Sequence, residues 1–198
     1  MTNFNYSPLK RHFFSHLKQK FMKYLKLALY VILGILVLYL GVCAIGPDDF
    51  KVNRSITIAA APSSVFPHVA DFSQWKDWSP WQKNDPALAG TYEGTPGTVG
   101  HKWEWKSKKE GDGTQEIVEL RQDSYIKTAL SFTPDKKDVF YSTWKFEGDS
   151  TQTKVTWDMD SGKVPYMMRG MLLIMGIEKM MDGYYERGLN DLKKIAEK

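Results

Sequence analysis

Residues Asp71–Trp81, DFSQWKDWSPW, carry three of the seven tryptophans of this 198-residue chain. Asp71, Phe72 and Ser73 are typical of a helix start, because short polar side chains accept hydrogen bonds from the first free backbone N–H groups. We therefore expect a short helical piece after Asp71 that carries Trp75, Trp78 and Trp81.

The residues before this stretch predict one strand and one helix. Lys51–Ile58 alternates apolar and polar side chains, which is typical of a strand. Ala59–Pro62 forms a turn, and Pro62 followed by two serines begins a helix. The apolar face expected for this helix consists of Val65, Phe66, Val69 and Phe72.

The residues after this stretch change from helical to strand periodicity at Leu88. His101–Lys106 alternates strictly, with His101, Trp103 and Trp105 on one face. The further strands expected are Gln115–Arg121, Tyr125–Phe132, Val139–Phe146 and Lys154–Met159. The turns expected between strands are Gly111–Gly113, Gln122–Asp123, Pro134–Lys137 and Gly148–Ser150. Closely spaced strands with tight turns predict an antiparallel meander. Pro165 then begins a long helical segment, Tyr166–Ala196.

This order predicts an α+β fold in which a curved antiparallel sheet wraps around the C-terminal helix, with a cavity between them unless large side chains fill it. It resembles the START-like (SRPBCC) helix-grip superfamily, which includes polyketide cyclase/dehydrase-like proteins, over residues 51–196. Asp71–Trp81 is similar to membrane-anchored bacterial members, as are Thr153–Trp157 and Gly188–Lys193. The resemblance implies a ligand cavity but no shared catalytic motif.

Leu27–Gly46 contains no charged residue and predicts a transmembrane helix. A helix of this length is about 30 Å long, which matches the hydrocarbon thickness of a bilayer. Residues 1–26 contain six basic and no acidic residues, whereas all 23 acidic residues follow the span. The positive-inside rule therefore predicts a basic cytoplasmic segment 1–26, an inner-membrane span 27–46 and an extracytoplasmic domain 47–198.

Two other interpretations of the span are open. A cleaved signal peptide has a similar apolar stretch. Cys43 could be lipidated, although Val42 stands where a small residue is expected. Cys43 is the only cysteine, which excludes a disulfide and a cysteine metal site in the outer domain. That domain is nearly neutral, which argues against nucleic acid as its partner.

The large number of aromatic residues points to an apolar ligand, although tryptophans at such spacings are also ordinary core residues. Six methionines lie early in the last helix and predict a cavity wall, a surface that contacts the bilayer, or core. The residues expected to bind the ligand are Trp75, Trp78, Trp81, His101, Trp103, Trp105, Trp144, Trp157, Met171, Met175 and Glu178.

Glu178 and His101 are the best candidates for an acid–base pair. The alternative is that Glu178 forms a surface ion pair and that His101 has structural hydrogen bonds. We find no catalytic triad, nucleotide-binding or metal-binding motif, and assign no catalytic residue, metal or cofactor.

These features predict a membrane-anchored protein that binds an apolar small molecule, a lipid or an isoprenoid. The first alternative is a polyketide-cyclase-like or hydrolase-like enzyme that uses the same pocket. The second is a protein-interaction module at the membrane, which a closed interior would favour. The sequence predicts no oligomeric state.

Overall fold

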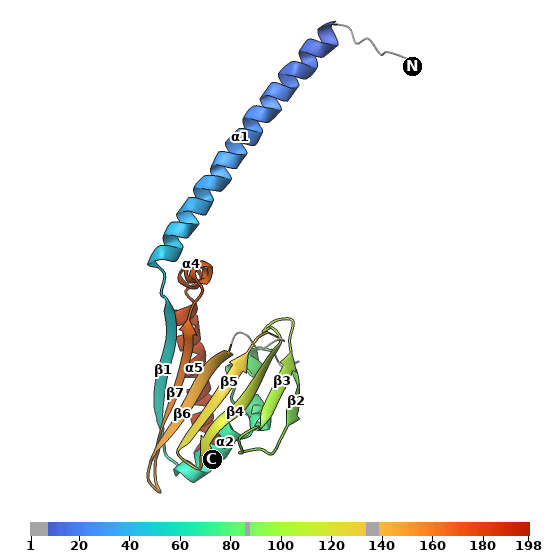
Figure 1. Cartoon of the computed structure of the whole chain (residues 1–198). Helices are drawn as coiled ribbons and strands as arrows, with labels where there is room; N and C mark the ends of the chain where they lie inside the picture. Colours follow the sequence, from blue (N-terminus) through green and yellow to red (C-terminus); the bar gives the residue numbers. More distant parts are fainter. Residues whose placement is uncertain (1–7, 86–87, 134–138) are drawn as a thin grey trace.

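The structure is a computed structural model that describes residues 8–85, 88–133 and 139–198. Within these residues, one long helix precedes a domain of seven strands and several helices (Figure 1). The helices are α1 (Pro8–Ile45), α2 (Pro62–Ala70), the 3-10 helix η1 (Phe72–Asp77), α3 (Pro80–Asn84), α4 (Tyr166–Met175) and α5 (Ile177–Ala196). The strands are β1 (Asp49–Ile58), β2 (Ala89–Glu93), β3 (Lys102–Lys106), β4 (Gly113–Arg121), β5 (Tyr125–Ser131), β6 (Val139–Gly148) and β7 (Thr153–Lys163).

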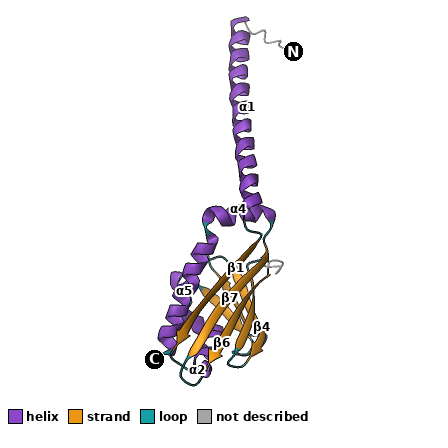
Figure 2. Cartoon of the chain, turned by 90° about the vertical axis from the view of Figure 1, so that its left-hand side faces the viewer, coloured by secondary structure: helices purple, strands orange, loops and turns teal. Residues whose placement is uncertain are grey.

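The strands form one antiparallel sheet in the order β1-β7-β6-β5-β4-β3-β2. Alternation decides which side chains face the core: in β6, Ser142, Trp144 and Phe146 are buried while Tyr141 and Lys145 are exposed. α5 lies against the inner face of the sheet, and α2 lies near one end of it (Figure 2). The predicted α+β helix-grip fold is confirmed.

The C-terminal helical segment differs from the prediction, because it is divided in two at Gly176. Gly176 has φ 60° and ψ 38°, and its N–H bonds to the carbonyls of Leu172 and Leu173 at the end of α4. A left-handed glycine is a common way to end a helix, because it has no Cβ to clash with the backbone. The chain therefore changes direction between α4 and α5 (Figure 2).

Two strands differ most from the prediction. β2 was not expected, and β7 continues to Lys163 because its last part pairs with Asp49 at the start of β1. The expected turn at 134–137 lies outside the described residues.

α1 is one continuous helix of 38 residues that extends away from the domain (Figures 1 and 2). Within it, Lys18–Ile45 is long and apolar enough to cross a membrane. A membrane anchor and a signal sequence both contain such a stretch.

Candidate functional site

An inner aromatic cluster fills the space between the sheet and α5. Trp144 on β6 lies opposite Trp157 on β7 in the strand register, and the two rings stack at 4.0 Å. Trp157 also stacks on Tyr185 of α5, at 3.8 Å. Trp75 of η1 and Trp78 just after it pack edge-on against Trp144. These five buried side chains, Trp75, Trp78, Trp144, Trp157 and Tyr185, define the inner cluster.

An outer aromatic cluster continues this surface across β3. It consists of Trp103 and Trp105, whose rings are 4.4 Å apart, and Phe132, which lies 6.2 Å from Trp105. Trp103 connects the two clusters, because its ring lies 6.4 Å from that of Trp75. Trp103 and Trp105 are buried, but Phe132 is 49% exposed. The aromatic surface therefore extends from the core to solvent.

Two glycines in the strands beside β3 make room for the outer cluster. A Cβ on Gly90 of β2 would lie 2.2 Å from Trp103 Nε1. A Cβ on Gly113 of β4 would lie 2.3 Å from Cζ2 of Trp105. Any larger residue at either position would displace an indole ring, so the two glycines fix the shape of this part of the inner face.

A polar row crosses the inner face on β4, β5 and β6. It consists of Gln115, Thr128 and Ser142, all of which are buried. Gln115 Nε2 donates to Thr128 Oγ1 at 3.1 Å, and the Thr128 hydroxyl donates to the Ser142 carbonyl at 3.4 Å. Ser142 Oγ accepts from Trp157 Nε1 at 2.8 Å and donates to the Asp158 carbonyl at 2.9 Å. The row thus ends on the inner cluster.

Two indole N–H groups stand out because they are buried without an acceptor. The N–H groups of Trp75, Trp78 and Trp105 each donate to a backbone carbonyl at 3.0 Å. Among the described residues, Trp103 Nε1 and Trp144 Nε1 have no hydrogen-bond partner. An unpaired buried donor costs about 1–3 kcal/mol. Both N–H groups are therefore candidates to donate to an oxygen atom of a bound molecule.

Sequence reasoning missed the polar row and Tyr185. The polar row consists of inward-facing strand residues, Gln115, Thr128 and Ser142. Their place in the strand alternation was the signal that could have predicted their burial. Tyr185 follows the apolar periodicity of α5, and its burial raises the pKa of its hydroxyl well above the ordinary value.

His101 has a structural position. Its ring is 1% exposed, Nε2 accepts from the Phe72 N–H at 3.2 Å, and Nδ1 lies 3.1 Å from the Glu93 carbonyl. This pattern requires the neutral ring with its proton on Nδ1. The imidazole thereby joins the start of η1 to the end of β2.

Asp71 caps η1, as the sequence predicts. Its Oδ1 accepts from the Ser73 N–H at 2.9 Å and from the Ser73 hydroxyl at 2.7 Å. Burial acts to raise the pKa of this carboxyl, but the hydrogen bonds from Ser73 and Gln74 outweigh it and hold the pKa below its ordinary value.

Of the other expected site residues, Trp81 contacts the edge of the inner cluster, with its ring 5.8 Å from Trp157 and 6.2 Å from Tyr185, whereas Met171, Met175 and Glu178 lie apart from the inner face. Met171 and Met175 are exposed on α4, and Glu178 is exposed in the first turn of α5. Trp81 of α3 is half-buried and stacks on Tyr184 at 5.3 Å. Glu178 and the buried His101 do not form a pair. No group of three or more potential metal-ligating side chains is present in the part of the chain that the structure describes.

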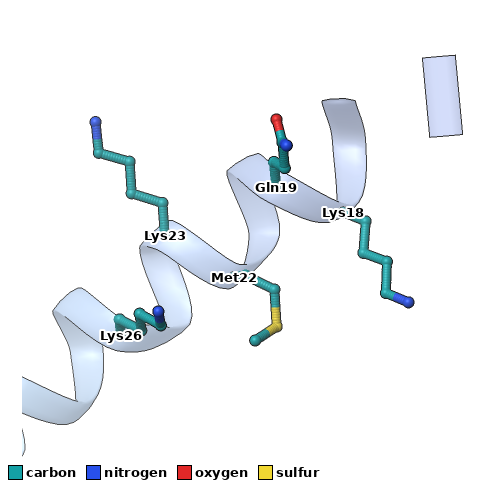
Figure 3. Close-up of a pocket in the computed structure, with 5 residues that line it drawn as sticks. All are labelled: Lys18, Gln19, Met22, Lys23 and Lys26. Carbon is teal, nitrogen blue, oxygen red and sulfur yellow. The ribbon is translucent and has the colours of Figure 1, made fainter. Parts of the chain in front are cut away.

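A hollow beside α1 is unrelated to this face. Lys18, Gln19, Met22, Lys23 and Lys26 line it, and their side chains project in different directions from one isolated helix (Figure 3). All of the described residues that line it belong to α1, so we assign it no ligand.

Known structures share the domain's fold. A Thermobifida fusca protein is 21% identical with a TM-score of 0.54, covering 74% of this chain and 92% of that one. A Chromobacterium violaceum protein is 14% identical with a TM-score of 0.53, covering 77% and 99%. The Aha1 dimer from Colwellia psychrerythraea is 14% identical with a TM-score of 0.50, covering 72% and 96%. At these identities the likeness shows the fold alone. No curated protein matches significantly.

One family model matches residues 49–197, from the start of β1 to the end of α5, and its description is "Polyketide cyclase / dehydrase and lipid transport". This range contains both aromatic clusters and the polar row. The chain therefore belongs to the polyketide cyclase/dehydrase and lipid transport family.

Proposed function

We propose that this protein is a membrane-anchored binding protein for an apolar small molecule, such as a lipid or an isoprenoid, that carries at least one hydrogen-bond acceptor oxygen. The ligand lies against the outer aromatic cluster. The observation that carries this proposal is a continuous aromatic surface from the core to the half-exposed Phe132, with an unpaired indole N–H on Trp103.

The position of the ligand follows from packing. Beneath α5 the rings of the inner cluster stack at contact distance, so those side chains already occupy the space. The outer cluster has a solvent-exposed end, and an apolar ligand gains free energy there by covering aromatic surface. A ligand oxygen that reaches the buried Trp103 N–H beside Gly90 would then make the polar contact that fixes the orientation of the ligand.

The anchor and its orientation belong to the same proposal. α1 contains an apolar stretch long enough to cross a bilayer, and six basic residues precede the uncharged Leu27–Gly46. With the basic end in the cytoplasm, the domain lies outside the inner membrane and close to it. An apolar ligand that dissolves in the bilayer is then within reach.

The experiment is native mass spectrometry of the full-length protein, gently extracted from its own membrane, together with binding of a fluorescent phospholipid. We expect a discrete co-purifying mass. Trp103→Phe keeps an aromatic ring but removes the N–H, and should weaken binding about fivefold, the equivalent of about 1 kcal/mol for one hydrogen bond. Phe132→Ala should weaken it further by removing exposed aromatic surface.

The matched control is Tyr141→Ala, an exposed aromatic residue on the outer face of the sheet, which should leave binding unchanged. A bare protein mass with no probe binding would refute the proposal and favour the protein-interaction alternative. Equal losses in Phe132→Ala and Tyr141→Ala would show that the outer cluster is not the binding site.

A further inference from the structure

α4 exposes an unusual amount of apolar surface. Its ten residues, YMMRGMLLIM, include one charge, Arg169. Surface helices normally present a polar face to water, and a contiguous exposed apolar patch marks a contact surface. The large apolar side chains of α4 that are 42–66% exposed are Tyr166, Met167, Met168, Met171, Leu173, Ile174 and Met175.

Hydrogen bonds attach α4 to the C-terminal end of α1. Tyr39 of α1 donates from its hydroxyl to the Met167 carbonyl at 2.6 Å. In the reciprocal bond, the Tyr166 hydroxyl donates to the Leu40 carbonyl at 2.7 Å. The two helices therefore form one unit, in which α4 runs across the end of α1 (Figure 2).

The two helices also approach closely through small residues. A Cβ on Gly170 would lie 2.7 Å from Cys43 Sγ, and a Cβ on Gly46 would lie 2.7 Å from the Arg169 carbonyl oxygen. Larger residues at either glycine would push the helices apart. The position of α4 along the axis of α1 is thus fixed by packing as well as by hydrogen bonds.

This attachment sets the depth of α4 relative to a membrane. The contacts on α1 fall at Tyr39, Leu40 and Cys43, three to seven residues before the end of the uncharged stretch at Gly46. At about 1.5 Å per residue, these contacts lie about 5–10 Å inside the outer end of that stretch. Helices that lie in the membrane interface are buried to that same depth.

We propose that α4 is an interfacial helix that lies in the leaflet on the domain's side of the bilayer, with its exposed methionines and Ile174 among the lipid chains. The inference rests on the proposed role of α1 as a membrane span. Ten residues are too few to cross a bilayer, so α4 lies along the surface. Tyr39 and Tyr166 then lie at the membrane interface, where tyrosine is enriched.

Such a helix gives the domain one orientation on the membrane. A single span permits rotation and tilting of an attached domain, whereas a second contact beside the span restricts both. α5 begins directly after Gly176, so the helix that carries Tyr185 is joined to α4 through a single residue.

The test places an environment-sensitive NBD fluorophore on single cysteines in full-length Cys43→Ala protein, in vesicles of phosphatidylethanolamine and phosphatidylglycerol. Ile174→Cys and Met175→Cys report on α4, and Leu36→Cys reports on the middle of the span. Ser150→Cys, in the β6–β7 turn at the far end of the domain, is the control (Figure 1). Spin-labelled lipids with the quencher near the headgroup or deep in the chain give the depth.

We expect shallow spin labels to quench the two α4 probes at least twofold more than the Ser150→Cys probe, and deep spin labels to quench the Leu36→Cys probe. Quenching at Leu36→Cys but not on α4 would overturn this inference and leave the anchor intact. Blue-shifted but unquenched α4 probes would indicate that a second copy of the chain covers the helix, which also overturns it. No quenching at any position would refute the span itself.

Discussion

Replacing Ser142 by alanine tests whether the polar row stabilises the inner face. The Ser142 hydroxyl accepts from the Trp157 N–H at 2.8 Å and donates to the Asp158 carbonyl at 2.9 Å. An indole N–H left unpaired in the core costs about 1–3 kcal/mol, and loss of the second bond costs about 0.5–1.5 kcal/mol. We therefore expect Ser142→Ala to lower the free energy of unfolding by about 2–4 kcal/mol.

The assay is urea unfolding of the full-length protein in detergent micelles, followed by near-ultraviolet circular dichroism. Trp157→Phe removes the donor, so in the Ser142→Ala background position 157 has no indole N–H left unpaired. The two changes should then show a coupling free energy of about 1–2 kcal/mol in a double-mutant cycle. Ser150→Ala, at an exposed turn position, is the control and should stay within about 0.5 kcal/mol of the unchanged protein.

A Ser142→Ala protein as stable as the control would refute this reasoning. So would additive effects of Ser142→Ala and Trp157→Phe, since additivity would mean that the 2.8 Å contact contributes nothing of its own.

Three further predictions follow from particular contacts. Burial raises the pKa of the Tyr185 hydroxyl, so above pH 10 the unfolded chain loses the hydroxyl proton while the folded protein keeps it. The free energy of unfolding should therefore fall above pH 10 by about 1.4 kcal/mol per pH unit. Tyr185→Phe should remove that part of the slope in alkaline unfolding curves. Gly90→Ala should lower the free energy of unfolding in urea by about 1–3 kcal/mol, because the added Cβ would overlap the Trp103 indole. In a Trp103→Ala background, most of that cost should disappear. A Gly90→Ala protein of unchanged stability would contradict the packing of Gly90 against Trp103. Gly176→Ala should lower the free energy of unfolding by about 1–2 kcal/mol, measured by thermal unfolding, because alanine is strained at φ 60°. A gain in stability would instead show that α4 and α5 can merge into one helix.

The strands were predictable because the inner face of the sheet is buried, so apolar residues recur at every second position along each strand. The strand that sequence reasoning missed, Ala89–Glu93, is short and contains Gly90, which weakens the strand signal. The importance of Gly90 depends on the register, since only the pairing of β2 with β3 brings it under Trp103. No pattern within one segment contains that information.

The end of α4 was not predictable for a related reason. Gly170 and Gly176 are both glycines in an apolar helical pattern, yet Gly170 is helical and packs on Cys43, whereas Gly176 adopts the left-handed conformation that ends α4. The first is explained by close approach to α1, and the second by the change of direction before α5. Both causes are contacts between elements, so composition alone could not assign them.

Aromatic content indicated the inner face correctly but could not separate its two parts. Trp144 and Trp157 stack in the core beneath α5, while Trp103 and Trp105 continue toward the exposed Phe132. Both clusters consist of aromatic residues, so residue type does not separate them. They differ in what covers the rings, which depends on where α5 lies across the sheet.

The two indole N–H groups that lack a partner among the described residues lie one in each cluster, Trp144 in the inner and Trp103 in the outer. A fold selected for stability alone would gain from pairing the Trp103 and Trp144 N–H groups, since each costs about 1–3 kcal/mol while the net stability of a domain is about 5–15 kcal/mol. The neighbouring Trp105 and Trp157 are paired, so the same inner face does supply acceptors. An acceptor oxygen on an apolar ligand would offset the cost at Trp103. On this reasoning, Trp103→Phe should weaken ligand binding, while removal of the unpaired N–H should offset part of the packing energy that the smaller ring loses in the ligand-free protein.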